Sequence, residues 1–185
     1  MCADYTRPFE LPTQGERISQ KIVYFPGSTI GNFDPDEART FFEGIAALVE
    51  QGGGFLIGVD LKKDVEILED AYNDSEGMTS EFNMNILARM NRELGADFNM
   101  SRFEHSAVYN YDRDRIELHL VSLTDQTVHV ADRAISFEEG EAIHTENSYK
   151  YSLEGFSRLA ASAGLTVERV WTDPDRLFSV QYLTV

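Results

Sequence analysis

The sequence has a single cysteine, Cys2, among 185 residues, so no disulfide can form within the chain. This scarcity favours a reducing compartment, because proteins of oxidising compartments commonly rely on disulfides. Basic residues are also scarce: 16 Lys and Arg stand against 32 Asp and Glu, which gives a formal net charge of -16. Because polyanions would be repelled by this charge, we expect neither a nucleic acid nor a membrane as partner.

Long apolar runs and a basic segment followed by an apolar one at the N-terminus are lacking as well. The chain therefore has no predicted membrane span and no predicted secretion signal. With 42% hydrophobic residues it can still form one ordinary globular domain with a core. These features together predict a soluble, cytoplasmic protein.

The first part of the chain alternates β-like and helical patterns. Residues 22–25 and 55–61 are short apolar runs typical of buried strands. Between them Asp34, Pro35 and Glu37 have the spacing of a capped helix start. Since another helical pattern follows the second run, this order predicts a parallel sheet covered on both faces.

The middle of the chain has a different pattern. Residues 79–94 predict an amphipathic helix whose apolar face carries Phe82, Ile86, Met90 and Leu94. The β-like runs that follow predict antiparallel strands at 107–111, 115–122, 126–131 and 134–137. After them the pattern predicts a helix capped by Ser152 and an antiparallel hairpin of residues 165–171 and 178–185 at the sheet edge.

Two loops are candidates for ligand binding, because ligands of open parallel sheets bind beyond the carboxyl ends of the strands. The first, FPGSTIGN, offers Gly27, Ser28 and Asn32, and it matches neither the dinucleotide nor the phosphate-loop glycine pattern. An ordinary tight turn is an equally good interpretation. The second loop begins at Asp60, where a solvated helix start is the simpler alternative.

The histidines do not indicate a metal site by their spacing. His105, His119, His129 and His144 are not four residues apart on a helix, and no cysteine or clustered carboxylate accompanies them in the sequence. A nucleophile elbow of the G-x-S-x-G type is also lacking. We therefore expect no bound metal and no nucleophilic catalysis.

The segment HTENSYKYS, residues 144–152, would place Glu146 and Ser148 on one face if it formed a strand. A carboxylate and a hydroxyl on one face could bind a ligand rich in hydrogen-bond donors, such as an imidazole. The polar face of a half-exposed strand is the alternative.

Seven segments in order give the chain a family resemblance over nearly its whole length: FPGSTIGN, IGVDLKKD, AYND, FNMNILARMNRELGADF, RIELHL, HTENSYKY and WTDP. Together they resemble the histidine-specific S-adenosylmethionine-dependent methyltransferases of ergothioneine biosynthesis, which convert L-histidine into its trimethylated betaine, hercynine. The resemblance implies an α/β, class I (Rossmann-like) methyltransferase fold that lacks its first strands. It predicts a truncated core over residues 1–78, an inserted, mostly antiparallel β region for substrate binding over 79–150, and a return to the core over 151–185.

The resemblance also implies roles for substrate-binding residues. Asn32 would hold the α-amino and carboxylate end of the amino acid, and Tyr72 would contact the carboxylate. Glu146 and Ser148 would hydrogen-bond the imidazole. Leu118 falls where the family's best-known member has a Met in the pocket wall, a change that conserves volume. Methyl transfer to a neutral amine requires mainly positioning, so no acid/base side chain is expected beyond the positioning by Asn32.

The cofactor side of the site is expected to be incomplete. Asp4 and Tyr5 match the pair that lies against the adenine, and Gly27 with Ser28 belongs to the loop near the methyl donor. The family's other cofactor residues precede Asp4, and its sheet order is 3-2-1-4-5-7-6. We therefore expect weak or no cofactor binding and no turnover by this chain alone, with the strand at residues 21–25 as an exposed edge open to self-association. A methyltransferase for another amino acid, and a non-catalytic module, are the alternatives.

Overall fold

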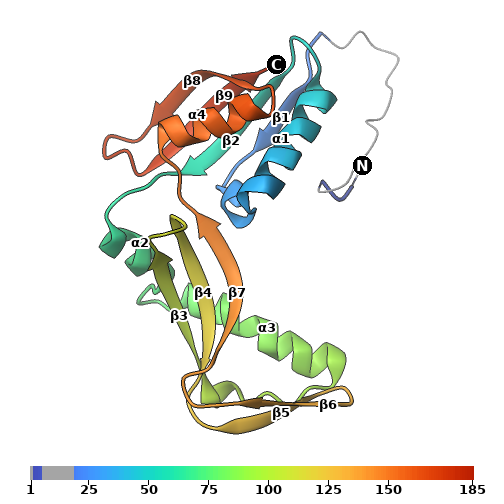
Figure 1. Ribbon diagram of the computed structural model, residues 1–185, viewed down its shortest axis with the longest axis vertical. Helices are drawn as coiled ribbons and strands as arrows, with labels where there is room; N and C mark the ends of the chain where they lie inside the picture. The colour runs from blue at the N-terminus through green and yellow to red at the C-terminus, as the bar shows by residue number, and fades with distance from the viewer. Residues whose placement is uncertain (1, 6–18) are drawn as a thin grey trace. The chain divides into compact units, whose positions relative to one another are not determined.

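The structure is a computed structural model that describes residues 2–5 and 19–185. It divides into two compact units (Figure 1). The first, which we call the sheet unit, comprises the described residues up to Lys62 together with Tyr149–Val185. The second, the insert unit, comprises Lys63–Ser148. Among the described residues, no helix is both long and apolar enough to cross a membrane.

The sheet unit contains a four-stranded sheet in the order β1-β2-β9-β8. Its strands are β1 (Ile22–Phe25), β2 (Gly54–Asp60), β8 (Thr166–Thr172) and β9 (Phe178–Thr184). β1 and β2 are parallel, whereas β9 is antiparallel to both of its neighbours. The predicted strands and the terminal hairpin at the sheet edge are therefore confirmed. The order corresponds to strands 4-5-7-6 of the expected methyltransferase sheet.

Two helices complete the core of this unit, α1 (Pro35–Val49) and α4 (Leu153–Ser162). The predicted start of α1 is confirmed, because Asp34 and Glu37 form a capping box in which the Asp34 N–H donates to Glu37 Oε2 at 2.9 Å. The hydroxyl of Ser152 accepts from the N–H of Gly155 at 3.0 Å and caps α4 as predicted.

The expectation of helices on both faces of the sheet is wrong for the part of the chain that the structure describes. α1 and α4 pack against each other, with the rings of Phe42 and Phe156 5.6 Å apart, and both cover the face that carries Phe55. On β1 the side chains of the opposite face are exposed, Ile22 by 57% and Tyr24 by 68%. The helix that was predicted after the second strand, α2, belongs to the insert unit.

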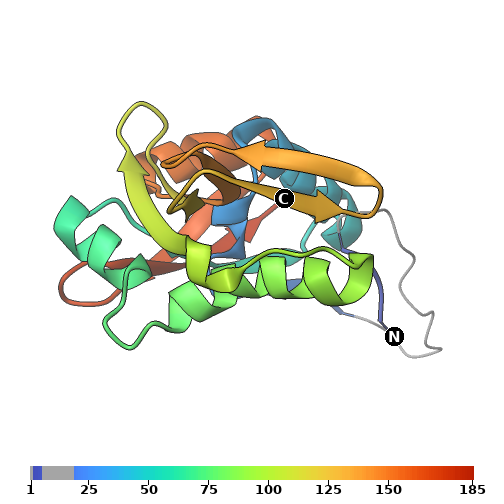
Figure 2. The same ribbon diagram turned by 90° about the horizontal axis from the view of Figure 1, so that it is seen from below.

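The insert unit combines two helices with two small sheets. Its helices are α2 (Val65–Tyr72) and α3 (Met78–Leu94). One sheet has the order β3-β4-β7, from β3 (Phe103–Asn110), β4 (Arg115–Ser122) and β7 (Ala142–Tyr149), and β5 (Gln126–Val130) pairs with β6 (Arg133–Phe137). The antiparallel pairings β3-β4 and β5-β6 confirm the predicted meander. Helix α3 contacts β3, β4 and β5 (Figure 2).

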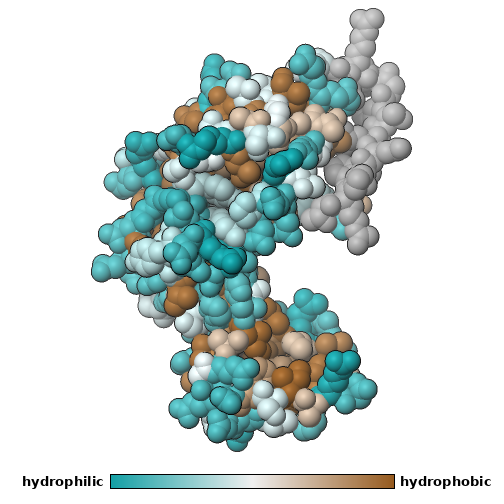
Figure 3. Space-filling view, viewed as in Figure 1, coloured by the Kyte–Doolittle hydropathy of each residue, from teal (hydrophilic) through white to brown (hydrophobic). Residues whose placement is uncertain are grey.

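The predicted apolar face of α3 is largely wrong. Phe82 is 65% exposed and Leu94 is 54% exposed, whereas the buried residues of the helix are Asn83 and Leu87. The amide of Asn83 donates to the carbonyl of His119 at 3.1 Å and lies 3.0 Å from Nδ1 of His105. These polar contacts turn α3 by about one residue from the predicted orientation, and apolar side chains reach the surface of the insert unit (Figure 3).

We expect Asn83→Ala to lower the free energy of unfolding by about 1–3 kcal/mol, because buried hydrogen-bonding groups would lose their partner. Urea denaturation followed by circular dichroism measures this change. Asn85 lies two residues away on the same helix and is exposed, so Asn85→Ala provides a matched control with little expected effect. Equal stabilities of the two variants would show that the Asn83 contacts do not hold α3.

Candidate functional site

The two loops that the sequence singled out are joined in the sheet unit. After β1, Gly27 and Ser28 adopt left-handed conformations, with φ of 75° and 57°, and lead into the short 3-10 helix η1 (Thr29–Asn32). The hydroxyl of Ser28 accepts from the N–H of Asp60 at 2.8 Å. The loops beyond the carboxyl ends of β1 and β2 therefore lie together. Asn32, at the end of η1, is exposed.

A buried ion pair lies beside this junction. Nζ of Lys150 is 2.8 Å from Oδ2 of Asp60, and the Lys150 side chain is 0% exposed. The neighbouring Tyr149 donates its hydroxyl hydrogen to Oδ1 of Asp34 at 2.8 Å. Neither contact was predicted from the sequence. The only available signal was the position of a lysine between two tyrosines, Tyr149 and Tyr151, at the start of the return to the sheet unit.

The expected adenine-contacting residues, Asp4 and Tyr5, precede the sheet. The ring of Tyr5 packs edge-on against Phe25 at 5.5 Å and against Phe41 at 6.1 Å. Tyr5 is 48% exposed, and Asp4 is also exposed. Tyr5 therefore lies beside Phe25, which ends β1 two residues before Gly27, and about half of the Tyr5 side chain is accessible.

In the insert unit, Tyr72 and Ser148 meet although 76 residues separate them: their hydroxyl oxygens are 2.8 Å apart. The backbone around Tyr72 is fixed on two sides. Its carbonyl accepts from Nε2 of His105 at 2.8 Å, and the side chain of Asn73 makes two hydrogen bonds with the backbone of Ala107, at 2.9 and 3.0 Å. The end of α2 is thereby anchored to β3, and the phenol of Tyr72 is held next to Ser148.

Glu146 and Ser148 lie two residues apart on β7, so they share one face of this strand, as the sequence predicted. Glu146 is half-buried and Ser148 is buried. Leu118 on β4 is only 2% exposed and belongs to a cluster against which Tyr72 packs. Its carbonyl accepts from the hydroxyl of Thr145 on β7 at 3.0 Å. The insert unit thus contains four of the five expected substrate residues, and among them it brings Tyr72 into contact with Ser148 and packs Tyr72 against the cluster of Leu118.

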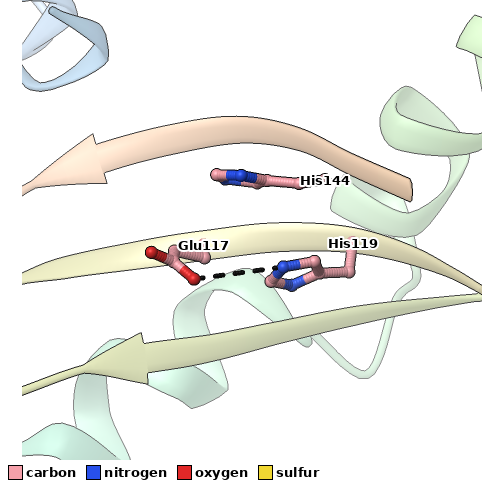
Figure 4. Close-up of side chains that lie close together, drawn as sticks. All are labelled: Glu117, His119 and His144. Carbon is pink, nitrogen blue, oxygen red and sulfur yellow. Dashed lines mark ion pairs between the residues drawn. The ribbon is translucent and has the colours of Figure 1, made fainter. Parts of the chain in front are cut away.

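A second group of polar side chains lies in the same sheet. Glu117 and His119 on β4 and His144 on β7 place their potential ligand atoms within 4.8 Å of one another (Figure 4). The two imidazole rings stack, with centroids 4.9 Å apart and 28° between the planes. A carboxylate therefore accompanies two of the histidines in space, contrary to expectation, because neighbouring strands of a sheet bring together residues that helical spacing does not relate.

Burial, hydrogen bonds and neighbouring charges together set the protonation of Glu117 and His119. Burial favours the neutral form of Glu117, but hydrogen bonds and the positive charge of Arg115 outweigh it and lower the pKa of the carboxyl below its ordinary value. Burial also lowers the pKa of His119, and the proximity of His144 acts in the same direction. At neutral pH, Glu117 is therefore a carboxylate and His119 a neutral imidazole.

The chain is similar to known histidine methyltransferases over most or all of its length. The model of the family described as histidine-specific methyltransferase, SAM-dependent, matches residues 1–185. The histidine N-alpha-methyltransferase of Mycolicibacterium smegmatis is 43% identical over 159 residues, which are 85% of this chain and 50% of that protein. The protein of the same name from Mycobacterium tuberculosis is 39% identical over 94% of this chain and 54% of its own length. The chain therefore spans about half the length of these relatives.

More distant similarities were also found. Ergothioneine biosynthesis protein 1 of Neurospora crassa is 32% identical over 83% of this chain and 17% of its own length. A solved S-adenosylmethionine-dependent methyltransferase from Clostridium acetobutylicum superposes with a TM-score of 0.48 at 10% identity, over 100% of this chain and 63% of that one. Because the family model covers every residue, the chain belongs to the histidine-specific, S-adenosylmethionine-dependent methyltransferases.

Proposed function

We propose that this chain takes part in the S-adenosylmethionine-dependent Nα-methylation of L-histidine to hercynine in the cytoplasm, and that it supplies the substrate-binding residues. The observation that carries the proposal is the arrangement of Tyr72, Ser148 and Glu146 in the insert unit. The Tyr72 phenol fixes the Ser148 hydroxyl at 2.8 Å, and Glu146 shares the face of β7 with Ser148. A carboxylate and an oriented hydroxyl suit the two ring nitrogens of an imidazole.

The reaction that these residues would serve is an in-line displacement. In each step the neutral α-amine attacks the methyl carbon, a C–N bond forms, the C–S bond breaks, and its electron pair goes to sulfur to give S-adenosylhomocysteine. The amine must lose a proton before each of the three transfers. The amide of Asn32 can accept a hydrogen bond from the amine without a negative charge that would favour the ammonium form. The protein's contribution is to position the reactants and exclude water.

S-adenosylmethionine supplies the methyl group when it is bound. In this chain Asp4, Tyr5, Gly27 and Ser28 are the residues proposed to contact it. The turn fits such a role, because open space surrounds the position that a side chain at Gly27 would occupy, and its positive φ suits glycine. A ligand could therefore approach the backbone closely at this turn. Self-association through β1, the outer strand of the described sheet, stays a prediction.

Isothermal titration calorimetry of the 185-residue chain with amino acids tests this proposal. We expect L-histidine to bind more tightly than L-phenylalanine and L-tryptophan. Of these three side chains, only the imidazole has two ring nitrogens, one for a hydrogen bond with Glu146 and one for a hydrogen bond with Ser148. A separate titration with S-adenosylhomocysteine is expected to give weak or no binding, and assays with both substrates to give no hercynine.

Each alternative function has its own result. Tighter binding of another amino acid would assign the chain to a methyltransferase with a different substrate. If circular dichroism shows a folded chain that binds no amino acid, the proposal fails and a non-catalytic module is favoured. Formation of hercynine by the chain alone would support the reaction and contradict the expected weakness of cofactor binding.

A further inference from the structure

The hydrogen bonds between β4 and β7 place two histidines opposite each other. The N–H of Ser122 donates to the carbonyl of Glu141 at 2.8 Å, and the hydroxyl of Thr145 donates to the carbonyl of Leu118 at 3.0 Å. Ser122 lies four residues after Leu118, whereas Glu141, the residue before β7, lies four residues before Thr145, so the chain runs in opposite directions through β4 and β7. The stacked rings of His119 and His144 show that these two residues lie side by side on the two strands.

Glu117 lies two residues before His119 and shares its face of β4. One carboxylate oxygen, Oε1, accepts from Nε of Arg115 at 2.8 Å and from the amide of Asn110 at 3.0 Å. The other, Oε2, is 4.0 Å from Nε2 of His119. Arg115 and Asn110 thus hold the carboxylate in place with its second oxygen toward the histidines.

His144 is oriented in a similar way. Its Nε2 is 3.2 Å from the backbone carbonyl of Glu146, and since a carbonyl only accepts, Nε2 carries the hydrogen. The lone pair of this imidazole is then on Nδ1. Metal-binding histidines commonly donate their other N–H to a carbonyl or carboxylate, which fixes the tautomer and the orientation of the ring. Both Glu117 and His144 therefore have the supporting contacts of metal ligands.

We propose that Glu117, His119 and His144 bind a divalent transition-metal ion, for which Zn²⁺ is the best match. Two imidazoles and one carboxylate form a known zinc ligand set with an open fourth position for water. The potential ligand atoms lie within 4.8 Å of one another, whereas donors about 2.0–2.2 Å from one zinc ion lie roughly 3.5 Å apart. Small side-chain rotations close this difference, and the exposed position of His144 leaves solvent space for its part of the movement.

A bound ion would link β4 to β7. Glu146 and Ser148 follow His144 on the same face of β7, so the ion would fix the strand that carries the proposed imidazole-binding residues. The methyl transfer itself needs no metal, so the proposed ion would act on the strand and not on the reacting atoms. An ion that binds only the folded chain also raises its thermal stability by mass action.

Titration of the metal-free chain, without an affinity tag, with Co²⁺ and then Zn²⁺ tests the site. A Cys2→Ser background removes the exposed thiol as a competing ligand. We expect one Co²⁺ per chain with the visible absorption of a tetrahedral complex, its displacement by Zn²⁺, and a higher melting temperature with Zn²⁺. His119→Asn and His144→Asn should each lower the affinity for Zn²⁺ at least about 10-fold. Substitution of a residue that only hydrogen-bonds a metal ligand already costs about that much, and loss of a ligand itself should cost more.

His129 provides the control, because it lies on β5 in the same unit and is paired with the exposed Asp97 at 3.1 Å. His129→Asn should bind Zn²⁺ as the unsubstituted chain does. Circular dichroism shows whether each variant is folded, and His144→Asn decides the outcome if His119→Asn does not fold. Failure of the folded chain to bind Co²⁺ or Zn²⁺ would overturn the proposal, as would unchanged affinity in His144→Asn or an equal loss in His129→Asn.

Discussion

Asp60→Asn is expected to lower the free energy of unfolding of the sheet unit by about 3–5 kcal/mol, because it removes the carboxylate that neutralises a buried charge. The charge is that of Lys150, whose side chain is 0% exposed and whose Nζ lies 2.8 Å from Asp60. Urea denaturation measures the effect. Trp171 is the only tryptophan of the chain and lies on β8, so its fluorescence reports the unfolding of this unit.

Two further variants make this prediction specific. Asp175→Asn removes a carboxylate from an exposed turn of the same unit and should change the stability little. The double variant Asp60→Asn with Lys150→Met removes both charges, and it should recover much of the lost stability because well-packed apolar replacements of buried ion pairs are often neutral or better. If Asp60→Asn and Asp175→Asn unfold at the same urea concentration, the ion pair does not stabilise the sheet unit.

Local sequence signals were sufficient for most elements of the fold. The strand predicted at residues 22–25 is β1, and the one predicted at 55–61 differs from β2 by one residue at each end. Helix α1 begins at Pro35, and the start was predictable because the capping residues Asp34 and Glu37 lie within one helical turn of each other in the sequence. Such signals depend on neighbouring residues alone. Which face of the sheet the helices cover depends instead on the path of the chain between strands. The expectation of helices on both faces was wrong for this reason.

The orientation of α3 could not be predicted from hydrophobicity. Phe82 and Ile86 are four residues apart and appeared to define the buried face, yet the helix buries Asn83. Its amide finds partners in His105 and His119, both of which are distant in the sequence. A polar residue is buried at low cost only when such partners exist, and a pattern that scores apolar side chains contains no information about them.

In the candidate site, too, the arrangement of residues close in the sequence was predictable, whereas contacts between distant residues were not. The shared face of Glu146 and Ser148 follows from the alternation of a strand and was predicted. The contact of Ser148 with Tyr72 joins residues 76 positions apart, and that of Lys150 with Asp60 spans 90 positions. Rules of residue spacing apply within one helix or strand and do not predict contacts between residues so far apart in the sequence. Likewise, Glu117 and His119 meet His144 only because β4 and β7 are neighbours in the sheet.

Glu146→Ala is expected to raise the dissociation constant for L-histidine about 10- to 150-fold, because a hydrogen bond to a charged group contributes about 1.5–3 kcal/mol. Glu146→Gln should have a smaller effect, since the amide oxygen can still accept from an imidazole N–H. Calorimetry on the same chain gives both constants. This prediction depends on the proposed role of the insert unit and is separate from metal binding, which is measured without any amino acid.

A comparison of ligands separates a specific contact from general damage to the pocket. L-Phenylalanine has no ring nitrogen, so Glu146→Ala should change its weaker binding little or improve it, and the preference for L-histidine should fall. Glu104→Ala removes an exposed carboxylate from β3 in the same unit and should leave both affinities unchanged. Because both variants lower the net negative charge equally, an equal loss of L-histidine affinity would mean that long-range electrostatics, and not a Glu146–imidazole hydrogen bond, attracts the substrate.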